Sequence, residues 1–331
     1  MKSMSGSDLL RELLPVCEGE VNRHLAMARD WHPHDYIPWD DGRNFAAMGG
    51  VDWDPSQSAL SETAKAAMIT NLLTEDNLPS YHRVIAQNFT LDDAWGHWVG
   101  RWTAEENKHS VVMRDYLVVT RGVDPVALEN ARMQHMTHGF DPMADRRRSD
   151  LELAPRADDR RLDRSADMLF AVAYVTFQEL ATRVSHRNTG KACGDPIADR
   201  MLARVAADEN LHMLFYRNIV AGALDLTPDQ AIKAIYAVLS LFQMPGASMP
   251  DFRRNAVLIA KAGIYDLPQH LDDVVNPVLK KWNIFERNDF GPEGERTRDE
   301  LAVFLSDLSG KVERFERSRE RALARDAKAA S

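Results

Sequence analysis

The chain has 331 residues, of which 44% are hydrophobic and 27% charged, and its formal net charge is −9. This composition supports a sizeable core, excludes a fibrous or disordered chain, and disfavours nucleic acid as the main partner. The two cysteines, Cys17 and Cys193, lack the spacing of a thiolate metal site or a disulfide framework. With no signal peptide and no apolar run near the roughly 18 residues of a membrane span, we expect a soluble, cytoplasmic protein that is not transmembrane.

The predicted elements are helices, and no period-two pattern of comparable length predicts a sheet. Residues 1–60 are predicted to form an irregular N-terminal wrap, because residues 31–57 are dense in Pro, Gly, Asp and Trp. In residues 61–223 the apolar residues recur at three- and four-residue steps, which predicts two pairs of amphipathic helices. Residues 224–310 predict covering helices, and residues 311–331 predict a charged, solvated tail. We expect a single helical domain over residues 1–331.

A charged stretch lies between the two predicted helix pairs. Residues 146–164 contain seven arginines and five acidic residues around Pro155. Such a stretch is typical either of a solvated loop or of a surface that docks a partner.

Two Glu-x-x-His strings carry the chemistry, Glu106 to His109 and Glu209 to His212. The three-residue step places both side chains of each string on one face of a helix. Each of these faces is otherwise apolar or aromatic, so both acids point into a core. One such string alone is more simply explained by a buried histidine that hydrogen-bonds a neighbouring glutamate.

Two further glutamates, Glu75 and Glu179, lie on apolar stripes and are predicted near the middle of their helices. Glu75 precedes Glu106 by 31 residues, and Glu179 precedes Glu209 by 30, so the chain twice runs from a lone Glu to a Glu-x-x-His. Each interval fits a helical hairpin that brings its two acids to the same depth. Two facing hairpins give the ferritin-like arrangement, with one Glu from each of two helices and Glu-x-x-His from the other two.

The predicted ligand set therefore has four glutamates and two histidines. Four buried carboxylates need compensation, and two divalent ions bring the site close to neutrality. Carboxylate and imidazole ligands without thiolate favour iron or manganese, and oxygen chemistry favours iron. Asp208 is a candidate to orient a ligand histidine by accepting its second N–H. His82, His97 and His186 are predicted to be structural or to support the ligands.

Four strings then resemble the signature segments of the soluble acyl-acyl-carrier-protein desaturases, over roughly residues 30 to 265. The strings are TEDNLPSYH (74–82), WTAEENKH (102–109), FQELAT followed by SHRNTG (177–190), and ADENLH (207–212). The resemblance implies an all-α, ferritin-like four-helix bundle with two iron ions and additional covering helices. It implies that Glu75 and His109 complete one iron site, that Glu179 and His212 complete the other, and that Glu106 and Glu209 bridge. Thr182 would act in proton delivery or oxygen activation.

By the same resemblance, the expected activity is the oxygen-dependent insertion of a cis double bond into a long acyl chain. The expected partners are acyl carrier protein, a ferredoxin-type electron donor and a second copy of the chain in a homodimer. The absence of a plastid-type transit peptide suggests a bacterial member. Arg146 to Arg148, Arg160 and Arg161 are candidates for a patch that binds the acidic carrier protein.

Several alternatives share the predicted ligand set. A hydroxylase or the small subunit of a ribonucleotide reductase uses the same ligand types, although the flanking strings argue against both. An iron-storage or ferroxidase protein is disfavoured by the length of the chain. A catalytically silent relative that only binds acyl carrier protein is disfavoured by the intact ligand set.

Overall fold

The described residues of the computed structural model, 3–141, 164–243 and 251–330, form helices, and no strand occurs among them. The prediction of an all-α fold is confirmed. Residues 146–163 of the Arg-rich stretch lie outside the described residues, including the proposed carrier-protein candidates. No helix among the described residues is both long and apolar enough to cross a bilayer.

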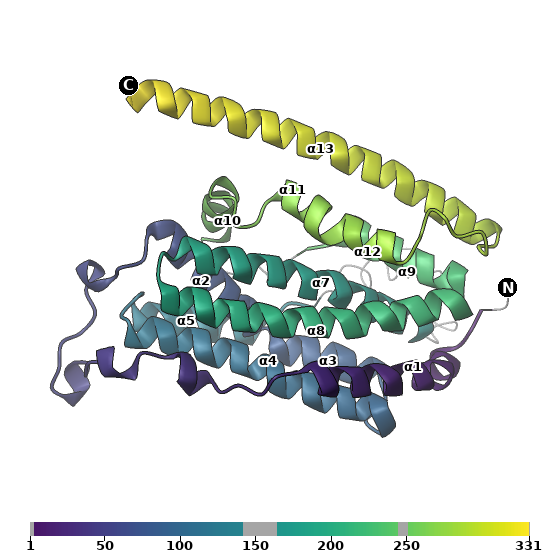
Figure 1. The fold of residues 1–331 in the computed structure, drawn as a ribbon, viewed down its shortest axis with the longest axis horizontal. Coiled ribbons are helices and arrows are strands. Elements are labelled where there is room, and N and C mark those ends of the chain that lie inside the picture. Colours follow the sequence, from purple (N-terminus) through teal and green to yellow (C-terminus); the bar gives the residue numbers. More distant parts are fainter. Residues whose placement is uncertain (1–2, 142–163, 244–250, 331) are drawn as a thin grey trace.

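Four helices lie side by side and form a central bundle (Figure 1). They are α2 (Glu62–Glu75), α4 (Asp93–Val119), α7 (Arg164–Ala192) and α8 (Pro196–Leu226). Local chemistry sets their ends. The side chain of Ser61 accepts the Ala64 N–H at the start of α2, and Asp195 accepts the Ile197 N–H at the start of α8. Gly194 has a φ of +65°, which lets the chain reverse tightly between α7 and α8.

Helix α3 (Leu78–Asn88) continues the direction of the chain after a break that the sequence interpretation did not locate. Pro79 has no N–H, and in a continuous helix its ring would clash with the carbonyl of Glu75, four residues earlier. The break at residues 76–77 relieves this clash, and the Asn77 side chain is fixed by hydrogen bonds with the backbone of Phe140. Glu75 is therefore the last residue of α2, and the prediction that it lies near the middle of its helix is wrong.

The N-terminal segment is more regular than predicted. Helix α1 (Gly6–Met27) replaces the first part of the expected irregular wrap over residues 1–60. Its buried stripe runs at steps of three and four residues, as an amphipathic helix requires, and the stripe packs on α8, α4 and α7. Residues 33–57 contain only the short 3-10 turns η1 to η4 (Pro33–Tyr36, Trp39–Asp41, Ala46–Met48 and Pro55–Gln57).

Additional helices cover the bundle, as predicted, although α5 lies between the two predicted helix pairs rather than within residues 224–310. They are α5 (Pro125–His138), α9 (Pro228–Leu241), α10 (Phe252–Lys261), α11 (Leu267–Gln269), the π-helical turn η5 (His270–Val275), α12 (Asn276–Lys281) and α13 (Pro292–Ala330).

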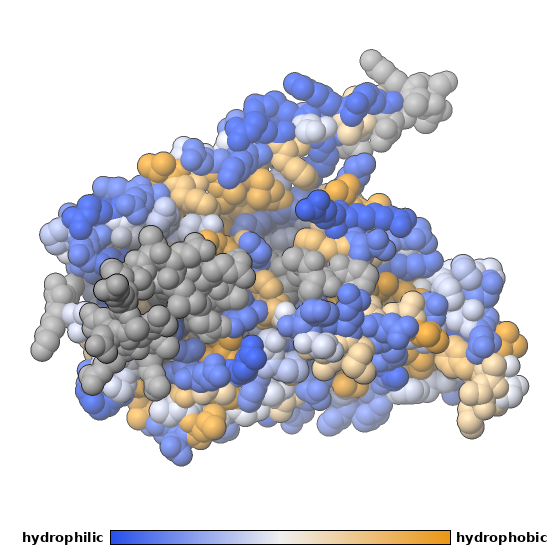
Figure 2. All heavy atoms as spheres, turned by 180° about the vertical axis from the view of Figure 1, so that it is seen from behind, coloured by the Kyte–Doolittle hydropathy of each residue, from blue (hydrophilic) through white to orange (hydrophobic). Residues whose placement is uncertain are grey.

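Residues 311–330 of the predicted tail form the second half of α13 rather than a separate segment. Val312 on α13 is buried, and Arg319 binds Asp266 at 2.6 Å. Figure 2 shows that the C-terminal part of α13 projects from the body and carries mainly hydrophilic residues. The division of the chain into one domain with these boundaries stays a prediction.

Two apolar clusters fill the interior of the bundle. The larger cluster includes Trp98 and Trp102 of α4, Phe177 of α7 and Tyr216 of α8. The smaller cluster includes Met68 and Leu72 of α2, Met113 of α4 and Leu202 of α8. On both α4 and α8, the residues of the Glu-x-x-His strings lie between the segments that supply the two clusters. The candidate site is therefore a polar layer enclosed by apolar packing.

The packing of α1 gives the first prediction. Leu13 is fully buried against the bundle, so Leu13→Ala should lower the free energy of unfolding by about 2–5 kcal/mol. Leu25, on the same helix, is 41% exposed, so Leu25→Ala should change it by less than about 0.5 kcal/mol. Urea unfolding of the metal-free protein measures both. Equal losses would contradict the packing of α1 described here.

Candidate metal centre

The structure brings all six predicted ligand residues into one buried layer. Glu75 comes from the end of α2, Glu106 and His109 from α4, Glu179 from α7, and Glu209 and His212 from α8. None of the six is more than 5% exposed. The two lone glutamates and the two Glu-x-x-His strings thus lie at one depth in the bundle, as the chain intervals predict.

The six residues form two groups that share two members. In one group, Glu75, Glu106, His109 and Glu209 offer ligand atoms within 4.8 Å of one another, and in the other Glu106, Glu179, Glu209 and His212 do so. Nδ1 of His109 is 3.1 Å from a carboxylate oxygen of Glu209 and 3.5 Å from one of Glu75. Nδ1 of His212 is 2.6 Å from Glu106 and 3.6 Å from Glu179. Glu106 and Glu209 belong to both groups, so each can bridge two ions.

The donor atoms fit a pair of metal ions better than they fit one another. His109 Nδ1, His212 Nδ1 and one oxygen each of Glu106, Glu179 and Glu209 are buried without a hydrogen bond of acceptable geometry. The short distances between the histidine Nδ1 atoms and the carboxylate oxygens are thus not hydrogen bonds. The lone pairs of these atoms instead point toward common points. Buried polar atoms in such numbers are costly unless something binds them. Carboxylate and imidazole donors without thiolate suit iron or manganese.

Electrostatics show the cost of assembling this layer without metal. Burial, together with repulsion from Glu106 and Glu209, raises the pKa of Glu179 well above its ordinary value. Burial and the charge of Glu209 act to raise the pKa of Glu75, but the nearby ring of His109 and the hydrogen bond with His186 outweigh them and lower it. Burial acts to lower the pKa of His109, yet the surrounding carboxylates raise it well above its ordinary value. The metal-free layer therefore retains protons that a cation would displace.

Further side chains hold the carboxylates in place. Nε2 of the buried His186 lies 2.8 Å from an oxygen of Glu75, so this histidine supports a candidate ligand. The indole N–H of Trp102 donates to Glu179 at 3.1 Å, and the hydroxyl of Thr182 donates to Glu209 at 2.8 Å. By contrast, His82 bonds Thr103 and His97 is exposed, and neither belongs to the two groups.

Each candidate ligand histidine also faces a carboxylate at its other ring nitrogen. Nε2 of His212 lies 3.0 Å from Glu105. Nε2 of His109 lies 3.6 Å from Asp208, which is beyond hydrogen-bonding distance. Asp208 therefore lies where the sequence predicts it but does not accept the predicted hydrogen bond, whereas Glu105, which does accept one, was not predicted. The repeated string Arg-x-x-x-acid-Glu-x-x-His, which starts at Arg101 and again at Arg204, contains the signal for both.

A third cluster, formed by His24, Glu105 and His212, also has donor atoms close enough to hold a cation. Arg101 already occupies the other oxygen of Glu105, at 2.6 Å. A guanidinium cannot lose its charge, and it repels a metal ion at this position. We therefore assign no metal to this cluster.

A small cavity of about 200 Å³ lies directly beside the layer. Its walls come from three helices and one following residue: Thr70, Asn71 and Thr74 of α2, Ala181, Thr182 and Ser185 of α7, Phe252, Ala256 and Ile259 of α10, and Tyr265. Because Thr182 both lines this cavity and donates to Glu209, a molecule in the cavity would lie next to a shared carboxylate.

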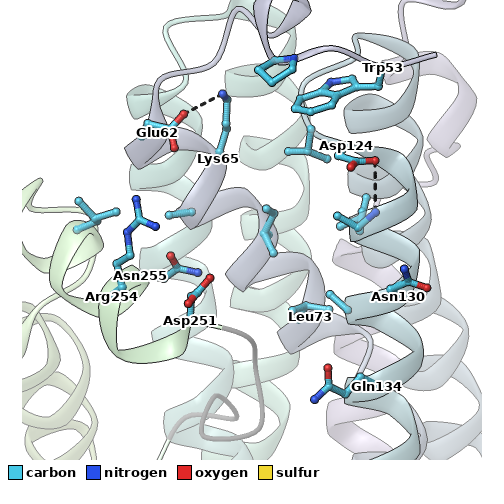
Figure 3. A pocket seen from close by; sticks show the side chains of 18 residues that line it. Trp53, Glu62, Lys65, Leu73, Asp124, Asn130, Gln134, Asp251, Arg254 and Asn255 are labelled. Atoms are coloured by element: carbon cyan, nitrogen blue, oxygen red, sulfur yellow. Dashed lines mark hydrogen bonds and ion pairs between the residues drawn. The ribbon is translucent and has the colours of Figure 1, made fainter.

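A larger groove of about 680 Å³ lies on the other side of α2 (Figure 3). Lys65 and Leu73 of α2, Asn130 and Gln134 of α5, and Arg254 of α10 surround it. It contains none of the six candidate ligands. Helix α2 thus separates the groove from the inner cavity, and only the inner cavity adjoins the metal layer.

Comparison with known proteins agrees with this geometry. The fatty acid desaturase family model matches residues 5–330. The chain is 56% identical over 321 residues to the acyl-acyl-carrier-protein desaturase DesA1 of Mycobacterium tuberculosis, covering 97% of this chain and 91% of that protein. It is 26% identical to a chloroplast stearoyl-acyl-carrier-protein 9-desaturase of Arabidopsis thaliana, covering 88% of this chain and 73% of that protein.

The chain also superposes on the solved structure of the acyl-acyl-carrier-protein desaturase DesA2 of Mycobacterium tuberculosis, with a TM-score of 0.66. The two sequences are 32% identical, and the match covers 87% of this chain and 98% of that one. The fold and the site together define the class of this protein, a helical bundle that encloses a buried layer of glutamates and histidines. Within that class, this chain belongs to the fatty acid desaturase family.

The raised pKa of Glu179 gives the second prediction. Folding raises the pKa of this carboxyl, so the protein loses stability as the pH rises from the ordinary pKa, about 4.5, towards the pKa in the folded protein. The loss is about 1.4 kcal/mol for each pH unit in this range. Glu179→Gln removes this loss. The metal-free variant should therefore unfold at a higher temperature than the wild type, and the difference should grow as the pH rises above about 4.5.

Calorimetry with and without ferrous iron tests this prediction. With iron, the order should reverse, because the variant lacks a candidate ligand and gains less from the metal. Glu62→Gln, at a glutamate whose side chain is 75% exposed, serves as the control and should match the wild type in both states. A metal-free Glu179→Gln protein less stable than the wild type would refute the electrostatic account.

Proposed function

We propose that this chain is an acyl-acyl-carrier-protein desaturase that binds two iron ions and inserts a cis double bond into a long acyl chain. The observation that carries the proposal is the pair of four-residue groups that share Glu106 and Glu209 and adjoin the cavity at Thr182. In the overall reaction, two adjacent methylenes, one oxygen molecule, two electrons and two protons give an alkene and two molecules of water. Iron, when bound, supplies the activation of oxygen that this reaction needs.

The chain's own residues hold the ions and shape the surroundings. Glu75 and His109 would complete one iron site, Glu179 and His212 the other, with Glu106 and Glu209 between them. The two apolar clusters exclude water from both ends of the layer, which strengthens every electrostatic interaction inside it. Thr182 holds a proton on its hydroxyl, 2.8 Å from Glu209, at the wall that an acyl chain would touch. From this position Thr182 can deliver a proton to the reaction site.

The cavity between α2, α7 and α10 is the proposed path of the acyl chain. Most of its wall atoms belong to aliphatic or aromatic groups, and its hydroxyl groups come from Thr70 and Thr74 of α2, Thr182 and Ser185 of α7, and Tyr265. An acyl chain fixed in it presents a limited number of its methylenes to the layer, and this restriction selects the bond that reacts.

The proposal also requires an electron donor. Two cysteines are too few for a four-thiolate iron–sulfur cluster, so the two electrons must come from another protein, and we propose a ferredoxin-type donor. We also propose a homodimer. Helix α5 supports it by exposing Val126, Met133 and Met136 at 68%, 70% and 48%, at spacings of seven and three residues that place them on related faces. Light scattering measures the oligomeric state.

The third prediction concerns metal and product together. Metal-free protein loaded anaerobically should bind two ferrous ions per chain. With oxygen, a ferredoxin reducing system and a long-chain acyl carrier protein, it should release an acyl product lighter by two hydrogens. Glu106→Ala should lose most of the iron and all measurable turnover, whereas Glu62→Ala, on the surface of α2, should lose neither. A product heavier by one oxygen would identify a hydroxylase instead, and the absence of bound iron in the wild type would refute the metal centre.

The fourth prediction concerns the cavity. Ala256→Trp places a large ring in the cavity from the α10 side, away from the candidate ligands. The variant should bind two irons as the wild type does but should turn over long acyl chains at least about tenfold more slowly, since the ring displaces the chain. Val257→Trp, at the neighbouring residue that is 53% exposed, is the matched control. Full activity of Ala256→Trp would show that the acyl chain takes another path.

A further inference from the structure

His24, near the C-terminal end of α1, is buried to 1% exposure although nothing in its local sequence marks it as functional. Its Nε2 lies 2.8 Å from an oxygen of Glu105, which is 81 residues away in the chain. The same oxygen lies 3.0 Å from Nε2 of His212, and Arg101 binds the other oxygen. The Glu105 carboxylate therefore accepts hydrogen bonds from three side chains, one from each of α1, α4 and α8.

This arrangement determines how His212 presents its ring. A carboxylate only accepts hydrogen bonds, so both histidines donate through Nε2. When Nε2 of His212 carries the hydrogen, Nδ1 keeps its lone pair and faces Glu106 and Glu179. A partner of this kind fixes both the tautomer and the orientation of a metal-binding histidine. The rotation of the Glu105 carboxylate is in turn limited by His24 on one oxygen and Arg101 on the other.

The other half of the layer repeats this pattern with a different third donor. Asp208 faces Nε2 of His109, is bound by Arg204 from one helical turn earlier, and accepts a hydrogen bond from the indole N–H of Trp31 at 2.6 Å. The support crosses between the hairpins, because Glu105 on α4 faces a histidine of α8 and Asp208 on α8 faces one of α4. The N-terminal segment thus contacts both supporting carboxylates, through His24 on one side and Trp31 on the other.

We propose that His24 is a positioning residue for the metal position completed by His212, and that it acts through Glu105 without affecting the position completed by His109. This inference rests on the proposed function, because it presumes that the layer binds two ions. With this role of His24, α1 would make the two metal positions differ, in addition to packing against the bundle.

The experiment compares four variants of the full chain: His24→Phe, His24→Gln, Arg101→Met and Trp31→Phe. Metal-free protein is titrated with Co²⁺ for the two affinities, and protein loaded with ⁵⁷Fe²⁺ is examined by Mössbauer spectroscopy for the two iron environments. His24→Phe should weaken one of the two Co²⁺ affinities by about 10–100-fold and change one of the two iron signals. Arg101→Met should affect the same affinity and the same signal.

Two comparisons separate positioning from a general loss of structure. His24→Gln keeps an N–H donor near the position of Nε2 and should restore most of the affinity that His24→Phe loses. One of the two iron signals is expected to change in His24→Phe. In Trp31→Phe, that same signal should match the wild type. If His24→Phe fails to fold, Arg101→Met tests the same carboxylate from a side chain that is 30% exposed. Equal weakening of both ions, or no change in either, would overturn the role of His24, whereas a wild-type protein that binds fewer than two ions would refute the metal centre itself.

Discussion

The structure depends on one energetic constraint, the burial of four carboxylates and two imidazoles between two apolar clusters. Removing such charges from water costs several kcal/mol per group unless cations or hydrogen bonds compensate. The chain compensates only in part. Trp102, Thr182 and His186 each satisfy one carboxylate oxygen, while one oxygen each of Glu106, Glu179 and Glu209 stays unsatisfied. The oxygens left unsatisfied are those that face the two histidine Nδ1 atoms. These unpaired atoms together form the candidate metal site.

The same constraint explains why two hairpins are needed rather than one. A single hairpin supplies one lone glutamate and one Glu-x-x-His string, which is too few donors for two ions. Facing hairpins let Glu106 and Glu209 serve both groups. They also let each hairpin support the histidine of the other, since Glu105 and Asp208 each directly precede a shared glutamate. A one-residue shift along either helix would move both the shared glutamate and the supporting acid off their faces.

Much of this arrangement could be predicted from the sequence, because it is encoded in short-range spacing. The three-residue step within each Glu-x-x-His string and the nearly equal intervals of 31 and 30 residues predicted which side chains meet. What escaped prediction depends on contacts between distant segments. His24 meets Glu105 across 81 residues. A supporting role was open to His186 from the sequence, but its partner Glu75, 111 residues away, was not predicted. The position of Glu75 at a helix end has a local cause, because the ring of Pro79 excludes a continuous helix past the carbonyl four residues earlier, whereas the apolar stripe alone predicts that the helix continues.

The helices that carry the candidate ligands tolerate little change, so on the proposed acyl path we expect substrate selection to depend on α10. Helices α2 and α7 line the inner cavity with residues one to six positions away from candidate ligands, so substitutions there risk disturbing the layer. α10 carries no candidate ligand, and Ile259 is its one buried residue. Changes at Phe252 or Ala256 would therefore reshape the cavity without moving a carboxylate. On the proposed acyl path, the bond that reacts depends on how far the acyl chain extends past Thr182, so changes in α10 would alter the product while the candidate ligands stay the same.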